Sequence, residues 1–333
     1  MILATQSSHD MKTLEDFRRF FAERLSKELA AAESTRKNTI FKGVLVWVVA
    51  IPITALATWA SASFMGKEYL IPLIILNGLV FFFLAYMLWR EVLSSRRFYN
   101  LFKGRVIEGI IHYIDERLHY IPHRAIPVST FVKSRLFGKP VHQYEGDDYC
   151  FMQLENGTVV EFSEVHAFSL VKENNQRRQE PIFEGLFAHI RTSEGRVGDL
   201  YILPKGLSEA DLYQPGRVQA FTPDHSEFAE HFAVYANSGA AVRRYLTPSL
   251  MQAFLDFRAQ HPDRLLYYAS HGRDIYVGMT ANKQLFEPNV WQSLADVQSL
   301  EAFFVDLSTF MRVLGSVADL SGQPQASEPQ PAA

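Results

Sequence analysis

The chain has 333 residues, a formal charge of -3 and one cysteine, Cys150. A single cysteine excludes an internal disulfide and a structural zinc site built on thiolates. From Val106 onward the chain has 19 basic and 28 acidic residues. Because a surface that binds nucleic acid is normally basic, we expect no nucleic-acid partner.

The first 42 residues are predicted to contain a cytoplasmic amphipathic helix. Thr13 is suited to cap its N-terminus, and Asp16 follows three residues later, as in a capping box. Apolar residues then recur at spacings of three and four, at Leu14, Phe17, Phe21, Leu25 and Leu29. The apolar face has two interpretations: it lies on the membrane or a partner, or it packs on the protein's own cytoplasmic domain.

Two uncharged apolar segments follow. Residues 43–64, GVLVWVVAIPITALATWASASF, number 22, and residues 70–89, LIPLIILNGLVFFFLAYMLW, number 20. At about 1.5 Å per residue, a helix of the first length spans about 33 Å, enough to cross the hydrocarbon core of a bilayer. The linking MGKEY allows only a short external loop, so the sequence predicts a two-helix transmembrane hairpin.

Basic residues flank the predicted hairpin on the side away from its loop. They are Arg36, Lys37 and Lys42 before the first helix, and Arg90, Arg96, Arg97, Lys103 and Arg105 after the second. The positive-inside rule therefore predicts that both termini are cytoplasmic, and places these residues near lipid head groups. Ala60-Ser61-Ala62 has the form of a signal-peptidase site, but a run this long and this far from the N-terminus favours an uncleaved helix.

Residues 90–127 are predicted to form a basic juxtamembrane helix and linker. The apolar pattern extends this helix to Tyr120, after which Pro122 and Pro127 break it. Residues 128–320 are predicted to form a cytosolic α+β domain, and the Pro/Gln/Ala-rich residues 321–333 a disordered tail. Three hairpins are expected within the domain: residues 149–154 with 158–171, residues 182–192 with 199–203, and residues 265–270 with 274–280.

Amphipathic helices are expected beside these strands. Thr247-Pro248 predicts the start of one, with a capping hydroxyl followed by a proline at the first helical position, and His261-Pro262 ends it. A second apolar stripe runs from Leu300 to Leu314. The fold class predicted is therefore α+β, a transmembrane hairpin followed by antiparallel strands with a few amphipathic helices.

The stretch EFSEVHAF, residues 161–168, contains the candidate catalytic residues. Side chains alternate along a strand, so Glu164 and His166 share one face, where they would be able to act as general acid and base. His189 on a neighbouring strand is a third candidate. Equally, the pair fits a buried structural hydrogen bond or two solvated side chains on an edge strand.

No cofactor or metal site is predicted. His112, His119 and His123, and likewise His225 and His231, match no ligand spacing, and the chain lacks HExxH, GxSxG and GxxxxGK motifs. Cys150 lies in an apolar strand beside two aspartates, which predicts a buried, unreactive thiol.

Several separated motifs resemble one known family. After two N-terminal membrane helices come EFSEVHAF, then IFEGLFAHI at 182–190, EFAEHFAVYANSGAAVRRYLTPSLMQAFLDFR at 227–258 and IYVGMTANKQLFEP at 275–288. In this order they resemble a bacterial membrane-protein family catalogued as domain of unknown function 3137, over residues 98–320. The resemblance implies an integral membrane protein of bacteria with a cytosol-facing domain, and it implies no activity, substrate or catalytic residue.

The sequence thus favours a bacterial inner-membrane protein, multi-pass, with a cytosolic binding or scaffolding domain. Its expected partners are the lipid bilayer and a protein or a second copy of itself. The alternative is a membrane-anchored hydrolase that uses Glu164 and His166 with His189.

Overall fold

The computed structural model describes residues 12–64, 70–93, 96–173, 176–196, 198–206, 218–281, 285–286 and 297–319. The chain divides into two compact units, Met1–Gly109 with Glu287–Glu301 and Ile110–Phe286 with Ala302–Ala333. We call them the helical unit and the sheet unit. The predicted external loop and the predicted disordered tail lie outside the described residues.

The helical unit begins with the predicted capping box. The Thr13 side chain accepts a hydrogen bond from the Asp16 amide, and the Asp16 side chain accepts one from the Thr13 amide. Helical segments then follow without a break, namely α1 Leu14–Phe20, the π-helical turn η1 Phe21–Leu25 and α2 Ser26–Phe64. Phe17, Leu25 and Leu29 are buried, which favours packing within the protein over an interfacial helix.

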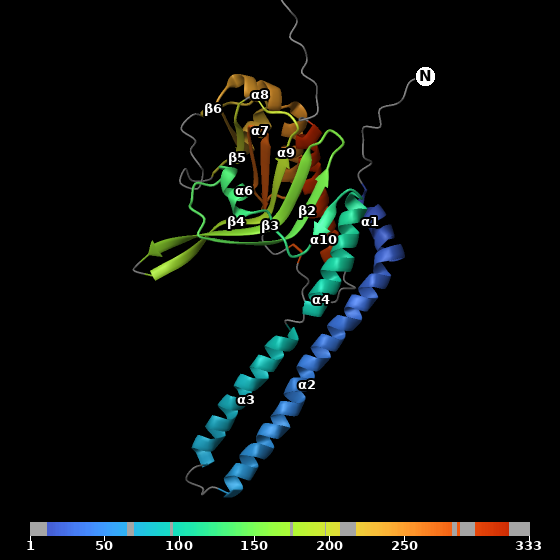
Figure 1. The fold of residues 1–333 in the computed structure, drawn as a ribbon, viewed down its shortest axis with the longest axis vertical. Helices are drawn as coiled ribbons and strands as arrows, with labels where there is room; N and C mark the ends of the chain where they lie inside the picture. Colours follow the sequence, from blue (N-terminus) through green and yellow to red (C-terminus); the bar gives the residue numbers. More distant parts are fainter. Residues whose placement is uncertain are drawn as a thin grey trace, which may run out of the picture. The chain divides into compact units, whose positions relative to one another are not determined.

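The apolar helices α2 and α3 (Leu70–Leu93) contact each other within this unit (Figure 1). Trp47 lies 6.0 Å from Phe81 and 6.2 Å from Trp89, measured between ring centroids. The segment Ala32–Ser61 of α2 is long and apolar enough to span a membrane, whereas the apolar part of α3, Ile74–Arg90, is shorter. One membrane-spanning helix near the N-terminus is therefore supported by length and composition.

The segment after α3 differs from the predicted juxtamembrane helix and linker. Three helical elements follow one another, α4 Arg96–Leu101, η3 Phe102–Ile107 and α5 Glu108–Ile114. The prediction that the helix continues to Tyr120 is wrong, because residues His119–Ile121 form strand β1. This strand pairs with β2, a contact between distant residues that overrides the local helical pattern.

The sheet unit contains a nine-stranded sheet in the order β1-β2-β3-β4-β9-β8-β5-β7-β6. After β1, its strands are β2 Gln143–Gln153, β3 Val159–Glu173, β4 Gln176–Arg191, β5 Leu200–Pro204, β6 Gln219–Phe221, β7 Phe232–Ala236, β8 Leu266–His271 and β9 Asp274–Thr280. Its other helices are α6 Val128–Lys133, α7 Ser226–His231, α8 Gly239–Tyr245, α9 Pro248–Gln260 and, from Ala302 onward, α10, which runs over Val297–Asp319. Every pair in the register is antiparallel, so the predicted combination of helices with antiparallel strands is confirmed.

Two of the three predicted hairpins are confirmed. The β2–β3 turn uses Gly157 at φ +80°, and the Thr158 amide donates to Asn156 Oδ1. The β8–β9 turn pairs His271 with Asp274. The predicted hairpin of residues 182–192 with 199–203 is wrong, because β9 and β8 lie between β4 and β5. Adjacency in sequence favoured that pairing, and the later hairpin displaces it.

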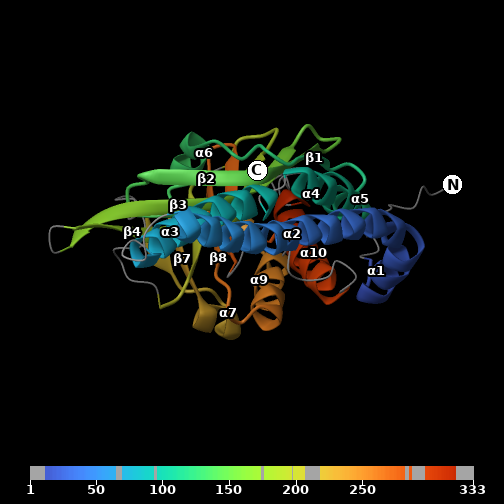
Figure 2. The same ribbon diagram turned by 90° about the horizontal axis from the view of Figure 1, so that it is seen from below.

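Helices cover both faces of the sheet (Figure 2). On one face the α6 residue Phe131 packs on Phe187, with ring centroids 4.9 Å apart. On the other face α9 and α10 pack through aromatic contacts, Phe254 with Tyr268 and Phe310 with Phe162. We call these the α6 face and the α10 face. The predicted start of α9 is confirmed, since the Thr247 side chain accepts from the Leu250 amide.

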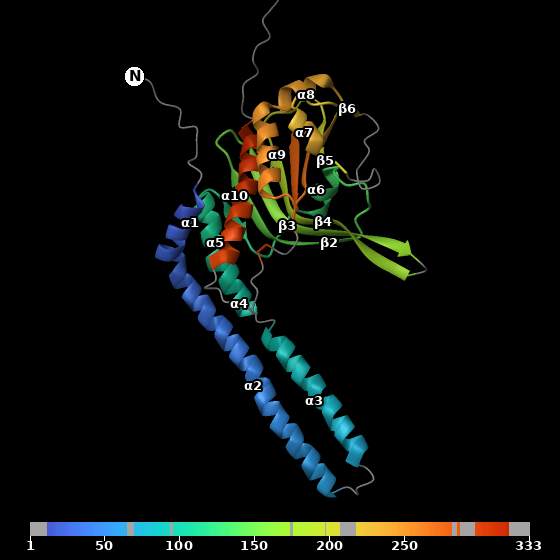
Figure 3. The ribbon, with the colours of Figure 1, turned by 180° about the vertical axis from the view of Figure 1, so that it is seen from behind.

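Strands β3 and β4 extend beyond the rest of the sheet (Figures 1 and 3). The register of β2 on β3 ends at Phe168, and that of β9 on β4 begins at Gly185. Residues 169–173 and 176–180 therefore pair only with each other. We call this two-stranded projection the arm.

Candidate functional site

The three candidate catalytic residues do not meet. In the β3–β4 register Glu161 lies opposite His189, and Glu164 lies opposite Leu186. Because side chains alternate between the faces of a sheet, His189 shares the α6 face with Glu161, while Glu164 and His166 are on the α10 face. The expected grouping of His189 with Glu164 and His166 is wrong, since it depended on a register that the sequence does not reveal.

Glu164 anchors a distant segment of the chain. Its side chain is 1% exposed, and its two oxygens accept hydrogen bonds from the Leu285 amide at 3.0 and 3.2 Å. The Phe286 amide also donates to Glu164 Oε2, at 3.4 Å. Phe286 is itself fully buried, with its ring 4.9 Å from that of Phe303. The carboxylate therefore holds residues 285–286 against the sheet.

His166 is the more open member of the pair. Its side chain is 19% exposed, and its two ring nitrogens lie 3.7 Å from the carboxylates of Glu164 and Glu184. The neighbouring Glu164 carboxylate, followed by the charge of Glu184, raises the pKa of His166 above its ordinary value of 6.5. At a given pH, a histidine whose charged form is stabilised in this way is in the neutral form that can accept a proton for a smaller fraction of the time.

Three carboxylates come together beside Glu164. Carboxylate oxygens of Asp147, Asp148 and Glu164 lie within 4.8 Å of one another. Among the described residues, this is the group of side chains close enough together to coordinate one cation. A bulge in β2 produces this arrangement, because the register shifts between Asp147 and Cys150 and Asp148 adopts φ +56°. Donors of the chain already contact this cluster: Tyr120 donates to Asp148, and the Leu285 and Phe286 amides donate to Glu164.

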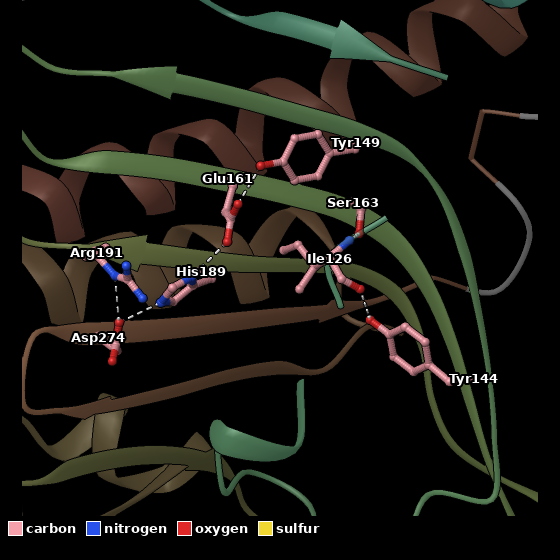
Figure 4. Close-up of polar contacts among 8 residues, drawn as sticks. All are labelled: Ile126, Tyr144, Tyr149, Glu161, Ser163, His189, Arg191 and Asp274. Carbon is pink, nitrogen blue, oxygen red and sulfur yellow. Dashed lines mark hydrogen bonds and ion pairs between the residues drawn. The ribbon is translucent and has the colours of Figure 1, made fainter. Parts of the chain in front are cut away.

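A second cluster lies on the α6 face (Figure 4). His189 Nδ1 is 2.8 Å from Glu161 Oε1, and His189 Nε2 is 2.7 Å from Asp274 Oδ1. The Tyr149 hydroxyl donates to the other Glu161 oxygen at 2.5 Å, and Arg191 Nε lies 3.6 Å from Asp274. We call these five residues the His189 network. It joins strands β2, β3, β4 and β9 across the sheet.

The pKa shifts of this network have a common cause. Burial opposes the charged imidazolium, but hydrogen bonds to Glu161 and Asp274 and their charges outweigh it and raise the pKa of His189. Burial likewise opposes ionisation of Glu161, but the hydrogen bonds from His189 and Tyr149 lower the pKa of Glu161 overall. The two carboxylates therefore favour the imidazolium form of His189. With both ring nitrogens engaged, it has no lone pair to accept a proton from a substrate.

Sequence reasoning did not assign Glu161, Asp274 or Tyr149 to a site. By the alternation of side chains along a strand, Glu161 lies on the face opposite Glu164. Asp274 begins a strand after a turn, where acidic residues are common, and Tyr149 is one of many aromatic residues in strands. The available signal was the alternation that separates Glu161 from Glu164, but the register that pairs it with His189 requires the sheet.

The connector before α6 is fixed to the same face (Figure 4). The Ile126 amide donates to Ser163 Oγ at 3.0 Å, and the Tyr144 hydroxyl donates to the Ile126 carbonyl at 2.7 Å. Ser163 and Ile126 are fully buried. These contacts close the α6 face next to the His189 network.

The other candidate groups have structural surroundings. Cys150 is fully buried, and burial raises the pKa of its thiol, in agreement with the predicted unreactive cysteine. The His225 side chain caps α7 by accepting from the Phe228 amide, and His119 stacks on Phe151 at 5.0 Å.

The basic residues predicted to lie near lipid head groups are in different environments. Arg36 and Lys103 are 8% and 3% exposed, so both are buried, and Arg36 contacts Glu33 at 2.6 Å. Burial leaves these two side chains little surface to offer to head groups, and the position of the set near lipid stays a prediction. Lys37, Lys42, Arg90 and Arg105 are exposed, and the side chains of Arg96 and Arg97 lie outside the described residues.

Residues 181–318 match a family model described as "Protein of unknown function (DUF3137)", so the family recognised in the sequence is confirmed over this range. His189 and Asp274 lie inside it, while Glu161, Glu164 and His166 precede it. No curated protein matches the chain. The crystal structure of mycobacterial trehalose monomycolate transport factor A, TtfA, is similar at 13% identity and a TM-score of 0.30, over 59% of this chain and 88% of that chain. A likeness at this level establishes neither a common fold nor a common activity.

Proposed function

The chain carries the domain of the DUF3137 family, and from that premise we propose that it is an integral membrane protein whose sheet unit is a binding or scaffolding module. Its partner in this proposal is a protein or a lipid at the membrane. The proposal places the protein in the bacterial inner membrane with both termini in the cytoplasm.

One observation favours a binding module over a hydrolase. The acidic and imidazole groups that looked suited to catalysis are already engaged: Glu164 by two backbone amides, and His189 by two carboxylates. A general base needs a free lone pair directed at a substrate proton. In the alternative, a membrane-anchored hydrolase, His166 would have to be that base, although two carboxylates favour its protonated form.

Two membrane helices are supported by the exposure of apolar side chains. Soluble proteins rarely expose large contiguous apolar surfaces, and here they continue along both α2 and α3. The exposed fraction is 69% for Trp59 and 64% for Leu56 on α2, and 70% for Ile71 and 65% for Leu79 on α3. α3 has 24 residues in all, within the length that spans a bilayer. The second span and a multi-pass topology therefore belong to the proposal.

The cytoplasmic position of both ends is supported by charge. Lys42 precedes the exposed apolar part of α2, and Arg90 and Arg105 follow that of α3, all three exposed. Basic residues at the same end of two antiparallel helices favour the cytoplasmic side.

A reporter fusion tests the topology. Alkaline phosphatase fused after Leu320 should be inactive in cells, and a cytoplasmic reporter at the same position should be active. A fusion within the MGKEY link should give the opposite pair of results. Phosphatase activity after Leu320 would overturn the proposed orientation.

In-membrane crosslinking of the full chain tests the binding function. A reproducible protein or lipid adduct on the sheet unit, retained in His166→Ala, supports a module that does not need an imidazole base. An activity that appears with the intact chain and disappears in His166→Ala, without loss of folding, would instead support the hydrolase.

A further inference from the structure

The arm differs in charge from the unit that carries it. The sheet unit, residues 110–286 and 302–333, has 24 acidic and 19 basic residues, yet the arm contains Lys172, Arg177 and Arg178. Of its two glutamates, Glu180 is bound to Lys139 at 2.8 Å. The arm is therefore a local cationic site on an acidic unit.

Two of its cations face each other. Lys172 and Arg177 are direct partners in the β3–β4 register, and both are exposed. Like charges directly opposite each other in a sheet destabilise the pairing. Among the described residues neither takes part in an ion pair. An anion bound from outside the chain would relieve this repulsion.

Apolar side chains are exposed beside these cations on both faces of the arm. Leu170 is 38% exposed on the face of Lys172, and Val171 is 41% exposed opposite Arg178. Cations next to exposed apolar residues suit the boundary between lipid head groups and acyl chains, where the charges meet phosphates and the apolar groups leave water.

A simpler role for these charges is protection of strand edges. Among the described residues no third strand pairs with either edge of the arm, and charged residues on such edges prevent aggregation. Edge protection works with charge of either sign, whereas attraction to an anionic surface requires positive charge. The two roles are therefore separable by charge reversal.

We propose that the arm, residues 169–173 and 176–180, docks on the anionic surface of a phospholipid bilayer. Lys172 and Arg177 contact the head-group phosphates, and Leu170 and Val171 enter the interface between head groups and acyl chains. The inference rests on the proposed membrane insertion and names the lipid partner of the sheet unit.

Because the chain is anchored in the bilayer, a small contact area is sufficient for the arm to bind the membrane surface. A chain anchored in the bilayer keeps the sheet unit at a high effective concentration beside the membrane, so a weak site is occupied. Each strand of the arm has five residues beyond the sheet, about 17 Å at 3.3 Å per residue, which is long enough for the tip to reach a surface that the sheet itself does not touch.

The test uses the full chain in lipid nanodiscs with an environment-sensitive dye on Gln176→Cys at the tip of the arm. Cys150 is fully buried, so labelling is confined to the new thiol. Nanodiscs of phosphatidylcholine alone are compared with nanodiscs of phosphatidylcholine and phosphatidylglycerol in equal amounts. We expect a blue-shifted emission, and quenching by nitroxide-labelled phospholipid, in the anionic discs, with both effects weakened by high salt.

The decisive variant is Lys172→Glu/Arg177→Glu, which keeps charged edges but reverses their sign. We expect it to keep the oligomeric state of the wild-type chain and to lose the blue shift and the quenching. The matched control, Lys133→Glu/Arg273→Glu, reverses two exposed basic residues outside the arm and should retain both signals.

The outcomes separate this inference from the proposed function. A chain that fails to enter nanodiscs contradicts the membrane proposal itself. A chain that enters them while its dye stays in water on anionic discs overturns only the lipid docking of the arm. An equal signal on neutral discs, or one that survives Lys172→Glu/Arg177→Glu, also overturns it.

Discussion

Glu164 and His189 lie on opposite faces of the same two strands and show two ways of burying a charge. Glu164 is bound by backbone amides, which cannot titrate. His189 is bound by two carboxylates that are partly open to water, Glu161 and Asp274, whose side chains are 20% and 31% exposed. The first arrangement attaches a segment of chain to the sheet, and the second joins strands by charge.

The difference has a physical consequence. Removing an acceptor from buried amides leaves donors that have no alternative partner, whereas carboxylates near the surface regain water when their partner is lost. We therefore expect the α10 face to respond most to substitution and the α6 face to respond most to pH.

The largest effect is expected from Glu164→Ala. It leaves the Leu285 and Phe286 amides without their acceptor and should lower the free energy of unfolding by about 4 kcal/mol. Urea denaturation of the full chain in detergent, followed by near-ultraviolet circular dichroism of tyrosines, measures it. Hydrogen exchange at residues 285–286 should accelerate.

Glu184→Ala is the control for that substitution, because Glu184 is 46% exposed on the same strand pair. It should change the free energy of unfolding by less than about 0.5 kcal/mol. Equal effects of the two substitutions would contradict the anchoring role of Glu164.

His189→Ala should cost less, about 2 to 3 kcal/mol. It removes two charge-assisted hydrogen bonds and leaves Glu161 and Asp274 near each other without the cation, but both carboxylates regain water. The same denaturation experiment measures the loss. A triple change of Glu161→Gln, His189→Ala and Asp274→Asn should recover part of it, and no recovery would argue against carboxylate repulsion.

The next largest effect is expected in the pH dependence of the free energy of unfolding, to which the His189 network contributes. Because the folded pKa of His189 is raised above 6.5, its contribution is complete below that value and is lost as pH rises through the folded pKa. Because the folded pKa of Glu161 is lowered below 4.5, its contribution is present above that value and is lost as pH falls through the folded pKa. The contribution of the network is therefore greatest between pH 4.5 and 6.5.

Free energies of unfolding, measured across this pH range for the wild-type chain and for His189→Gln, test whether the folded protein favours protonated His189. The difference between the two proteins should shrink as pH rises above the folded pKa of His189. A difference that stays constant with pH would show that His189 is not a cation in the folded protein.

The smallest effect is expected from His166→Ala. His166 is 19% exposed and lies 3.7 Å from each of two carboxylates, beyond hydrogen-bond distance. We expect a loss of about 0.5 kcal/mol, measured by the same denaturation. A loss of unfolding free energy as large as that of Glu164→Ala would show that His166 helps Glu164 to hold residues 285–286 against the sheet.

Several features of the fold were predictable because local signals determine them. The Thr13 capping box, the turn at Asn156-Gly157 and the start of α9 at Thr247-Pro248 each depend on residues within a few positions of one another. The long apolar run of α2 was equally visible, because bilayer thickness sets the length of a spanning helix.

The candidate site was only partly predictable. Alternation along EFSEVHAF correctly separated Glu161 from Glu164, but the residues that contact each of them are distant in sequence, at 189 and 285–286. The two wrong predictions in the fold also have distant contacts as their cause. The predicted helix ends early because β1 pairs with β2, and the predicted β4–β5 hairpin is replaced because the β8–β9 hairpin lies between these strands.

By itself, then, the sequence determined the apolar helices, the turns, the caps and the two faces of each strand, since these follow from spacing and from the conformations that single residues allow. The tertiary structure alone decided which strands are neighbours. A register joins residues far apart in the chain, and it is selected by burying the whole sheet at once. For that reason, the contacts of His189 with two carboxylates, and the hydrogen bonds of Glu164 with a distant backbone segment, are visible only in the folded sheet.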